Sequence, residues 1–492
     1  MPSPNKIQFG RPPWAVARKF RIVTFRAAVV VFRVLLCVGL GSPVWGQGFH
    51  FGADLSYVNE MEDCGVVYRE GGQAKDPYRI FAEHGCNLVR LRLWHTPSWY
   101  DTLNAGKRYS DLADVRRSIA RARAEGMQVL LDFHLSDNWA DPSKQLVPNA
   151  WLPVVDDLPL LEDSLHDYIF RTLSALAAED LLPELVQIGN ETNKGILLSP
   201  EDNQGWVLDW ERNSRLFNAA IQAVREVEAA AGRPVTIAIH PAGPENAEWL
   251  VDAFVQNGVT DFDLIGISYY WAWHQPTDIA QTGQVIARLR QKYPDKQVMI
   301  FETGYIWTWE DIDAAANILN AVHPDYAPPS PQNQKRWLVD LTRTVMENGG
   351  SGVIYWEPAW VSSPCRTQWG QGSHQEHATF FDFEYNLLDD GGIGWMNHDY
   401  GTTAVETPPE ARWKLQPAPD RRSLLLTLPP THLDSLTAHL FAPTGERVAV
   451  WDLSKELQSP ERKLSLPELP KGMYFFVLLA HGEVLGARKL PL

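Results

Sequence analysis

The chain has 492 residues, of which 45% are hydrophobic and 21% are charged. This composition is ordinary for a globular protein and indicates neither a disordered chain nor a bundle of membrane helices. The formal net charge of −16 argues against nucleic acid as a partner, because an acidic chain and the phosphates repel each other.

The first 46 residues contain seven Lys or Arg residues and no acidic residue. An apolar run from Val34 to Leu40 follows, and small residues lead to Gly46. This pattern is typical of a signal peptide, so we predict one over residues 1–46 and a secreted, extracellular or cell-surface protein. Arg33 interrupts the apolar run, which is shorter than the roughly 20 residues of a membrane span, so stable membrane insertion is not expected.

From Phe49 onward, short segments rich in β-branched residues alternate with stretches of helical period. This alternation predicts consecutive β/α units with parallel strands. The predicted strands are HFGADLS at 50–56, LVRLRLW at 88–94, QVLLDFH at 128–134, LVQIGNE at 185–191, VTIAIH at 235–240, DLIGISYY at 263–270, QVMIFETG at 297–304 and GVIYWEP at 352–358.

Eight such units in series predict an α/β fold, a (β/α)₈ TIM barrel over residues 47–407. Helix-like runs at 111–126 and 213–232 each end on the glycine expected just past a helix. A doubly wound open sheet is the alternative, but no glycine-rich phosphate turn follows the first strand. The segment is longer than the roughly 250 residues of a plain barrel. The excess falls in the loops after the third, seventh and eighth strands, where barrel enzymes hold their active sites.

A proline-rich break at Thr407–Pro419 ends the β/α pattern, and we predict a linker over residues 408–420. Beyond it, residues 421–492 form short alternating segments separated by the turn sequences PTGER and LPKGMY. This pattern predicts a small C-terminal β-sandwich.

The cysteines leave the disulfide pattern open. Cys37 belongs to the predicted signal peptide, which leaves Cys64, Cys86 and Cys365 in the exported chain. Export permits a disulfide, but an odd count leaves at least one thiol unpaired. Cys64 with Cys86 is the pairing that we favour. The sequence has no CxxC or HExxH motif, so no metal site is assigned and no cofactor is expected to be required.

Two glutamates end predicted strands, Glu191 the fourth and Glu302 the seventh. Hydrolysis of a glycosidic bond needs one carboxyl group to protonate the leaving oxygen and another to attack the anomeric carbon or activate water. If both side chains point inward, a separation of roughly 5–5.5 Å, typical of retaining enzymes, would follow. The strongest rival is Glu357, but its neighbour Trp356 shares the inward parity of Ile354, so a structural role is predicted for Glu357.

Other polar and aromatic residues gather near the strand ends, and 20 tryptophans suit a ligand with flat apolar faces, such as a sugar. Arg92 is expected to place a positive charge near the nucleophile and keep it ionised. Asp54 and Asp132 are expected to orient Arg or His side chains. The predicted substrate-binding residues are Asn190, Arg92, His134, His240, Tyr269, Trp139, Trp271 and Trp356. For His134, His240 and Tyr269, a role as satisfied core residues is the alternative.

The stretches FGADLSYVNEMED, LVRLRLWHTP, LLDFHLSDNWADPSKQ, VQIGNETNKGIL, DLIGISYYWAWH, IFETGY and YWEPAW together resemble glycoside hydrolase family 53, the endo-β-1,4-galactanases, over roughly residues 49–400. The resemblance implies a (β/α)₈ barrel that cleaves β-1,4-galactan, as in pectic arabinogalactan, with retention. It also implies that Glu191 is the acid/base and Glu302 the nucleophile. Some family members bind calcium in rim loops, but we matched no set of oxygen ligands, so structural calcium stays open.

The tail at 421–492, with LFAPTGERVAVWDL and LPELPKGMYFFVLLAHGEVLGARKL, resembles the C-terminal sorting domain of the type IX secretion pathway. This resemblance implies passage across both membranes of a Gram-negative cell. A carbohydrate-binding accessory module is the alternative.

Two other functions stay open: a retaining β-glycanase of the same barrel superfamily acting on glucan, mannan or xylan, and a non-catalytic surface glycan-binding protein. A monomer is expected.

Overall fold

A computed structural model describes residues 48–400 except Val207, and in the tail residues 414–418, 422–427, 436–442, 447–453, 461–467, 469–470, 473–480 and 483–491. The predicted signal peptide at 1–46 and most of the predicted linker at 408–420 lie outside these described residues. The chain divides into two compact units, with the boundary between Asn397 and His398. Each unit is described by itself below.

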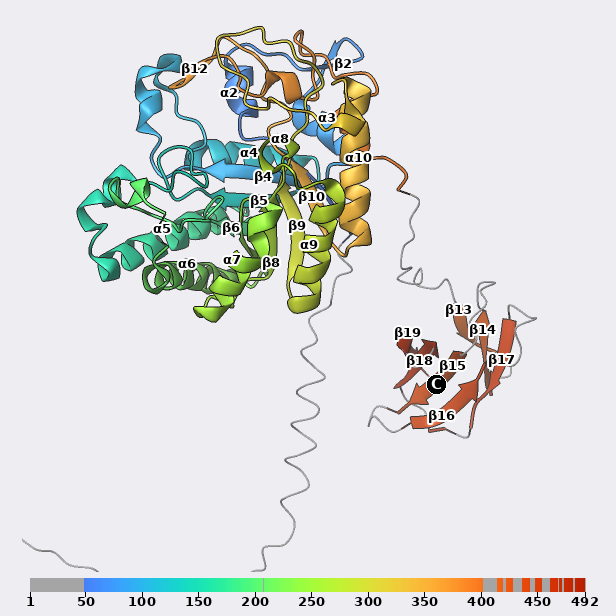
Figure 1. Ribbon diagram of the computed structural model, residues 1–492. Helices are drawn as coiled ribbons and strands as arrows, with labels where there is room; N and C mark the ends of the chain where they lie inside the picture. Colours follow the sequence, from blue (N-terminus) through green and yellow to red (C-terminus); the bar gives the residue numbers. More distant parts are fainter. Residues whose placement is uncertain are drawn as a thin grey trace, which may run out of the picture. The chain divides into compact units, whose positions relative to one another are not determined.

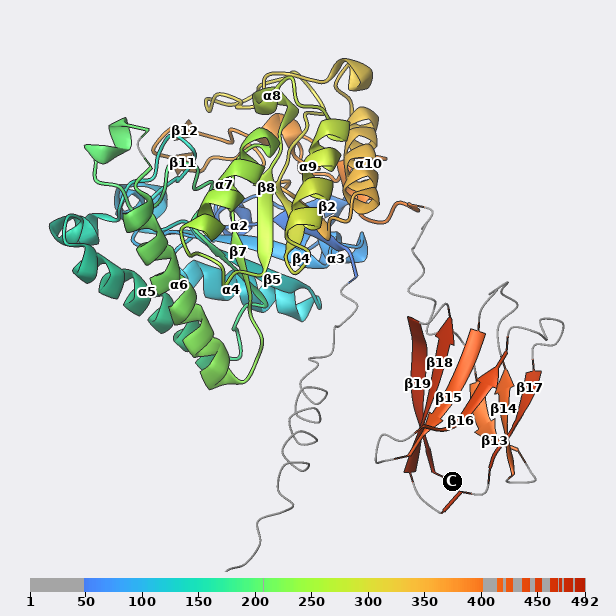
Figure 2. The same ribbon diagram turned by 60° about the horizontal axis from the view of Figure 1, so that its bottom comes forward.

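All eight predicted strand segments form strands, and they close into one parallel barrel in chain order (Figures 1 and 2). The barrel closes where β1 pairs with both β4 and β10. The predicted TIM barrel is therefore confirmed. Its strands are β1 (His50–Asp54), β4 (Leu88–Leu93), β5 (Gln128–Phe133), β6 (Leu185–Ile188), β7 (Thr236–Ile239), β8 (Leu264–Ser268), β9 (Gln297–Glu302) and β10 (Gly352–Tyr355).

Helices alternate with the strands and cover the outside of the barrel (Figures 1 and 2). Asp111, Asp157 and Asp209 cap the first turns of α4, α5 and α6 by accepting backbone N–H groups. Among the described residues, no helix has the length and apolarity needed to cross a membrane. The helices are α2 (Val58–Asp63), α3 (Pro77–Glu83), α4 (Leu112–Ala124), α5 (Leu158–Ala178), α6 (Trp210–Ala231), α7 (Pro244–Gln256), α8 (Trp271–His274), α9 (Ile279–Lys292) and α10 (Pro331–Glu347).

The barrel interior is packed with side chains from its strands. One buried cluster consists of Leu88, Leu130, Leu185, Ala238, Leu264, Met299, Phe301 and Ile354. Gly266 allows this packing, because a Cβ atom there would lie 2.1 Å from the ring of Phe301. The filled interior gives the C-terminal ends of the strands a rigid base, on which a site can be held.

Long loops follow β5, β9 and β10, as predicted, and the loop after β10 contains a small hairpin of β11 (Arg366–Thr367) and β12 (Gly370–Gln371). A second small hairpin, β2 (Arg69–Glu70) with β3 (Gln73–Ala74), follows α2. A disulfide joins Cys64, at the end of α2, to Cys365, just before β11, and Cys86 is a buried free thiol. The favoured pairing of Cys64 with Cys86 is therefore wrong, because nearness in sequence does not determine which loops meet at the rim.

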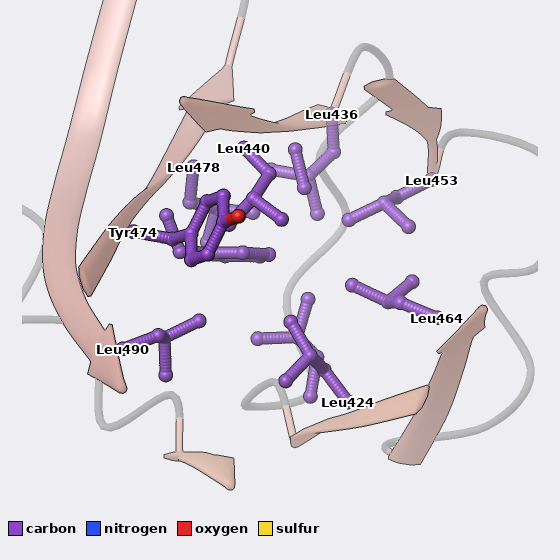
Figure 3. Packing of buried hydrophobic residues seen from close by; sticks show 11 residues of the cluster. Leu424, Leu436, Leu440, Leu453, Leu464, Tyr474, Leu478 and Leu490 are labelled. Atoms are coloured by element: carbon purple, nitrogen blue, oxygen red, sulfur yellow. The ribbon is translucent and has the colours of Figure 1, made fainter. Parts of the chain in front are cut away.

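The C-terminal unit is a sandwich of two antiparallel sheets, one ordered β13-β14-β17 and the other β16-β15-β18-β19 (Figure 2). Leucines from both sheets meet in one core: Leu424 and Leu464 from the first sheet pack with Leu440 and Leu478 from the second (Figure 3). The strands are β13 (Lys414–Pro417), β14 (Ser423–Thr427), β15 (Leu436–Phe441), β16 (Arg447–Asp452), β17 (Glu461–Ser465), β18 (Met473–Ala480) and β19 (Glu483–Pro491). The small β-sandwich is confirmed.

The sandwich begins earlier in the chain than residue 421, the predicted start. Within the predicted linker at 408–420, residues Lys414–Pro417 form β13 and pair with Leu424–Thr427 of β14. No strand was predicted there because the proline-rich composition is typical of a linker. A proline is nevertheless tolerated in an edge strand such as β13.

Candidate active site

A cavity of about 660 Å³ opens at the C-terminal ends of the barrel strands. Its walls come from the loops after β5, β6, β7, β8, β9 and β10, and Glu191 and Glu302 both line it. The cavity has the size of a ligand-binding site. The two glutamates singled out from the sequence are thus brought together in one compartment.

Glu191 stands in a tight turn that directly follows β6. Gly189 has a φ of +71° and Glu191 a φ of +48°. A Cβ atom on Gly189 would lie 2.6 Å from a methyl group of Thr192, so only glycine fits there. A left-handed backbone at a non-glycine residue is sparsely populated and is retained where the surroundings over-determine it. The strained turn holds the Glu191 carboxyl group at the cavity wall.

Glu302 is the last residue of β9 and is held by two partners. Its Oε1 lies 2.7 Å from Nη1 of Arg90, and its Oε2 accepts a 3.1 Å hydrogen bond from the hydroxyl of Tyr270. Arg90 also forms ion pairs with Asp54 and Asp132, at 3.0 Å and 2.7 Å. This buried network fixes the nucleophile candidate in one orientation.

The surroundings act differently on the pKa values of the two carboxyl groups. Burial raises the pKa of Glu302 to about 7, against the lowering effect of the Arg90 charge. Burial raises the pKa of Glu191 well above its usual range, and the nearby charge of Glu302 raises it further. The Arg90 guanidinium, 2.7 Å away, thus favours the ionised form of Glu302, whereas the nearby charge of Glu302 favours the protonated form of Glu191.

The predicted role of Arg92 beside the nucleophile is wrong, because Arg90 occupies that place. Arg92 instead donates to Oε1 of Glu357 at 3.0 Å, and both residues are 1% exposed. The rings of Tyr57, Trp94 and Trp139 lie 4.7, 4.4 and 4.2 Å from the guanidinium carbon of Arg92. Neither Arg92 nor Glu357 lines the cavity, which agrees with the structural role predicted for Glu357.

Asn190 lines the cavity, but its amide is already engaged. Its Oδ1 accepts from Arg90 Nη2 at 2.7 Å, and its Nδ2 donates to the Ala140 carbonyl at 2.8 Å. His240 lies behind it, with Nδ1 2.9 Å from Asn190 Oδ1 and Nε2 2.9 Å from the Ser268 hydroxyl. Burial lowers the pKa of His240 well below its ordinary value, so the ring is neutral.

His134 and His240 are buried and do not line the cavity. Nδ1 of His134 lies 2.9 Å from Asp132, while burial lowers the pKa of the ring. His240 matches the alternative given for it, a core residue whose neighbours satisfy it, whereas Nε2 of the buried His134 has no hydrogen-bond partner among the described residues. Both histidines support the carboxylates and the arginine from behind rather than forming the cavity wall.

The aromatic walls agree with the predictions only in part. Trp139 and Trp356 line the cavity, whereas Tyr269 and Trp271 do not. Tyr269 donates to the Thr277 carbonyl and stacks on Trp337, and Trp271 packs on His323. The aromatic residues that line the cavity but are absent from the predicted set are Trp206, Tyr270, Trp273, Trp360 and Trp369.

Comparisons with known proteins decide the family. The family model for glycosyl hydrolase family 53 matches residues 50–390. The chain belongs to glycosyl hydrolase family 53. It is 47% identical over 336 residues to the arabinogalactan endo-β-1,4-galactanase of Cellvibrio japonicus, covering 68% of this chain and 86% of that protein. It is 34% identical over 332 residues to the endo-β-1,4-galactanase of Bacillus subtilis, covering 65% of this chain and 72% of that protein.

Among solved structures, the chain resembles the Ignisphaera aggregans family 53 catalytic domain, with a TM-score of 0.63 and 32% identity. The match covers 72% of this chain and 97% of that domain. The family 53 resemblance stated from the sequence motifs is confirmed.

The rim of this family 53 barrel also contains a cluster of three carboxylates, Asp311, Asp313 and Glu376. One oxygen of each lies within 4.8 Å of the others. Glu376 is 1% exposed, and its Oε2 has no hydrogen-bond partner among the described residues. Burial raises the pKa of Glu376 to about 7, and the charges of Asp313 and Asp311 add to this. Oxygen ligands of this kind fit a hard cation such as calcium. The sequence did not reveal the cluster, because its members come from two different loops.

Proposed function

We propose that this chain is an endo-β-1,4-galactanase that hydrolyses β-1,4-galactan by double displacement, with retention of configuration. The observation that carries this proposal is the pair Glu191 and Glu302 in one cavity of a family 53 barrel, with the Arg90 guanidinium 2.7 Å from Glu302. Relatives in this family carry the name of the same activity.

In the first step, the Glu302 carboxylate attacks the anomeric carbon while Glu191 gives its proton to the leaving oxygen. In the second, the Glu191 carboxylate takes a proton from water, and that water attacks the anomeric carbon and releases Glu302. The carboxyl groups should lie roughly 5–5.5 Å apart for this chemistry. Arg90 supports it by favouring the ionised form of Glu302.

The substrate contacts are proposed from the cavity lining. Asn190 lies next to Glu191, and the second N–H of its Nδ2, the one not donated to Ala140, is the group proposed to bond a sugar hydroxyl near the reacting carbon. Trp139 and Trp356 present ring surface to the same cavity, and the flat apolar faces of sugar rings suit such walls.

Azide rescue assigns the two roles separately. With an activated aryl β-galactobioside, Glu302→Ala should react with azide to give the α-azide, because azide takes the place of the nucleophile. Glu191→Ala should give the β-azide, because azide attacks the glycosyl-enzyme. Exchanged products would reverse the two assignments. A wild-type chain that binds galactan without cleaving it would instead be the non-catalytic glycan-binding protein.

A panel of purified galactan, glucan, mannan and xylan tests the substrate. Galactose differs from glucose in the axial hydroxyl at carbon 4, so a site built for it should discriminate strongly. We expect endo-cleavage of galactan alone, measured by the lengths of the products. Proton NMR should show that the β-anomer of the product is released first. Preferential cleavage of another polysaccharide would place the chain with the other retaining glycanases of this barrel type.

We propose in addition that calcium binds Asp311, Asp313 and Glu376 and holds the loops after β9 and β10 together. Binding of the cation would relieve the repulsion among the three carboxylates. Adding calcium to chelator-treated protein should raise the melting temperature, and Asp313→Asn should abolish that rise. An equal rise in the variant would refute this site.

We also propose export, directed by the signal peptide at 1–46 and the tail at 421–492. The support is the charge and apolar pattern of the first segment and the motifs quoted for the second. In a Gram-negative host with type IX secretion, deletion of the tail should leave the enzyme in the periplasm. Release into the medium without the tail would favour the accessory-module alternative.

A further inference from the structure

Trp206 is the most exposed of the large hydrophobic residues that line the cavity. Its side chain is 67% exposed, and it lies in the loop between β6 and α6. A tryptophan with so much open surface contributes little to the core. The described tryptophans Trp249 and Trp309 are also exposed, by 44% and 56%, but neither lines the cavity. The position of Trp206 therefore needs an explanation other than packing.

The ring of Trp206 is backed by a buried cation. Nζ of Lys194 lies 5.0 Å from the ring centroid, and Lys194 is only 3% exposed. Its ammonium group donates to the carbonyls of Ser143 and Asn203. A cation over one ring face stabilises the indole in place by a cation–π interaction. Because Lys194 occupies that face and the side chain is largely open, the other face can receive a ligand.

The loop that carries Trp206 is tied to its neighbour. Asn203 accepts a 2.8 Å hydrogen bond from the backbone of Gln145, in the loop after β5. Lys194 connects the same two loops through Ser143. The platform is therefore built before the ligand arrives, so less ordering accompanies binding.

The position in the barrel indicates which part of the substrate Trp206 meets. Glu191 follows β6 and gives its proton to the leaving oxygen, so the leaving-group sugars extend from its side of the cavity. Trp206 belongs to the loop that begins at Glu191, whereas Trp369 belongs to the loop after β10, on the opposite side of the barrel.

We propose that Trp206 is a binding platform for a galactosyl residue on the leaving-group side of the cleaved bond. This inference rests on the proposed function. Galactose suits such a platform, because its axial 4-hydroxyl leaves the C–H groups of carbons 3, 4 and 5 together on one face, which can stack on an indole.

The platform should also bind the acceptor in glycosyl transfer. There the ester bond from the anomeric carbon to Glu302 breaks, a bond to the acceptor hydroxyl forms, and the hydroxyl proton passes to Glu191. A galactan oligosaccharide held by Trp206 competes with water for this step. Trp206 thus sets the partition between transfer and hydrolysis.

The test compares Trp206→Ala with wild type on two substrates. An aryl β-galactobioside places only its aryl group and no galactosyl residue on the leaving-group side, so its kcat/KM should stay within about two-fold of wild type. For galactotetraose and galactan, kcat/KM should fall about 5- to 10-fold, as expected for one lost aromatic contact. The yield of transfer to added galactotriose should fall by a similar factor. Trp206→Phe should keep most of the kcat/KM on galactotetraose and galactan and most of the transfer yield.

Trp309→Ala is the matched control, an exposed tryptophan of the rim outside the cavity, and should equal wild type. Unchanged galactotetraose kinetics and transfer in Trp206→Ala would overturn the platform, as would an equal loss on the aryl galactobioside. A wild-type enzyme inactive on all these substrates would instead overturn the proposed function.

Discussion

Two arginine–glutamate pairs lie at the barrel mouth, and the contrast between them separates chemistry from architecture. Arg90 and Arg92 are two residues apart on β4 and equally buried, and each meets a glutamate at the end of a strand. Glu302, the partner of Arg90, borders the cavity and is 6% exposed. Glu357, the partner of Arg92, is 1% exposed and lies apart from it.

The difference comes from what covers each pair. Tyr57, Trp94 and Trp139 surround the guanidinium of Arg92, and Trp360 stacks on Tyr57 with ring centroids 3.9 Å apart. This aromatic roof seals the Arg92–Glu357 pair from substrate. The same residue types therefore serve reaction or structure, according to which loops lie above them.

The two glutamates offer the largest contrast. Glu302→Gln should lower kcat/KM on galactan by about 10³-fold or more, because the nucleophile is lost, with little change in unfolding free energy. Glu357→Gln should keep activity within about ten-fold and lose about 2–4 kcal/mol of unfolding free energy, because Arg92 loses its buried counter-charge. Kinetics and urea unfolding measure both. Equal losses of activity would erase the distinction.

Replacing each arginine sharpens the distinction between the two pairs through the pH dependence of activity. Arg90→Met should reduce kcat/KM about 10²-fold and move the acidic limb of the kcat/KM profile to higher pH. The sign follows because Glu302 must be ionised, and the Arg90 charge lowers its pKa. Arg90→Lys should shift the limb less. Arg92→Met should destabilise the barrel and leave the limb in place; a comparable shift in Arg92→Met would show that both charges act on the nucleophile.

Tyr270 tests the cavity side alone. The hydrogen bond from Tyr270 lowers the pKa of Glu302, and Tyr270→Phe removes that bond. We expect a loss of about ten-fold or less in kcat/KM and a small shift of the acidic limb to higher pH. The melting temperature should hardly change. Tyr269→Phe is the matched control, because that hydroxyl lies outside the cavity.

The smallest effect on activity is expected for the disulfide, which ties the rim next to the aromatic roof. Cys64→Ser with Cys365→Ser should lose about 2–5 kcal/mol of unfolding free energy, because the unfolded chain regains its freedom. The kcat/KM should stay within about two-fold of wild type. Cys86→Ser controls for loss of a buried thiol, and an equal destabilisation there would deny the cross-link its role.

The sequence predicted the barrel, its eight strands and the shared cavity of Glu191 and Glu302, because strand composition and period reflect local burial. It also gave Glu357 its structural role, although the side chain meets the inward-facing Arg92 and does not turn away as parity suggested.

At the end of β8, Tyr270 and not Tyr269 continues the inward alternation of Leu264 and Ser268. Tyr270 therefore reaches Glu302 by simple alternation, and Tyr269 takes the core role given as its alternative. The register irregularity between β8 and β9 lies on β9, because Ile267 and Ser268 of β8 pair with Ile300 and Glu302, and alternation along one strand cannot reveal such a bulge.

The sequence also failed to predict the functional residues that lie in loops. Trp206 and Trp369 lie in segments without a period, and Asp311, Asp313 and Glu376 meet only because two loops fold over each other. Arg90 and Arg92 were indistinguishable, since both fit the same face of one strand. In each case the missing information was the path of a loop, which single-sequence patterns do not encode.

The bond between Cys64 and Cys365 also turns most of the barrel into a covalent ring. Its ends are 301 residues apart in sequence, and β4 through β10 lie between them. A protease that cuts one of the rim loops inside this ring opens the chain without separating it into two molecules. The nicked enzyme would run as a single species on a denaturing gel until a reductant splits it.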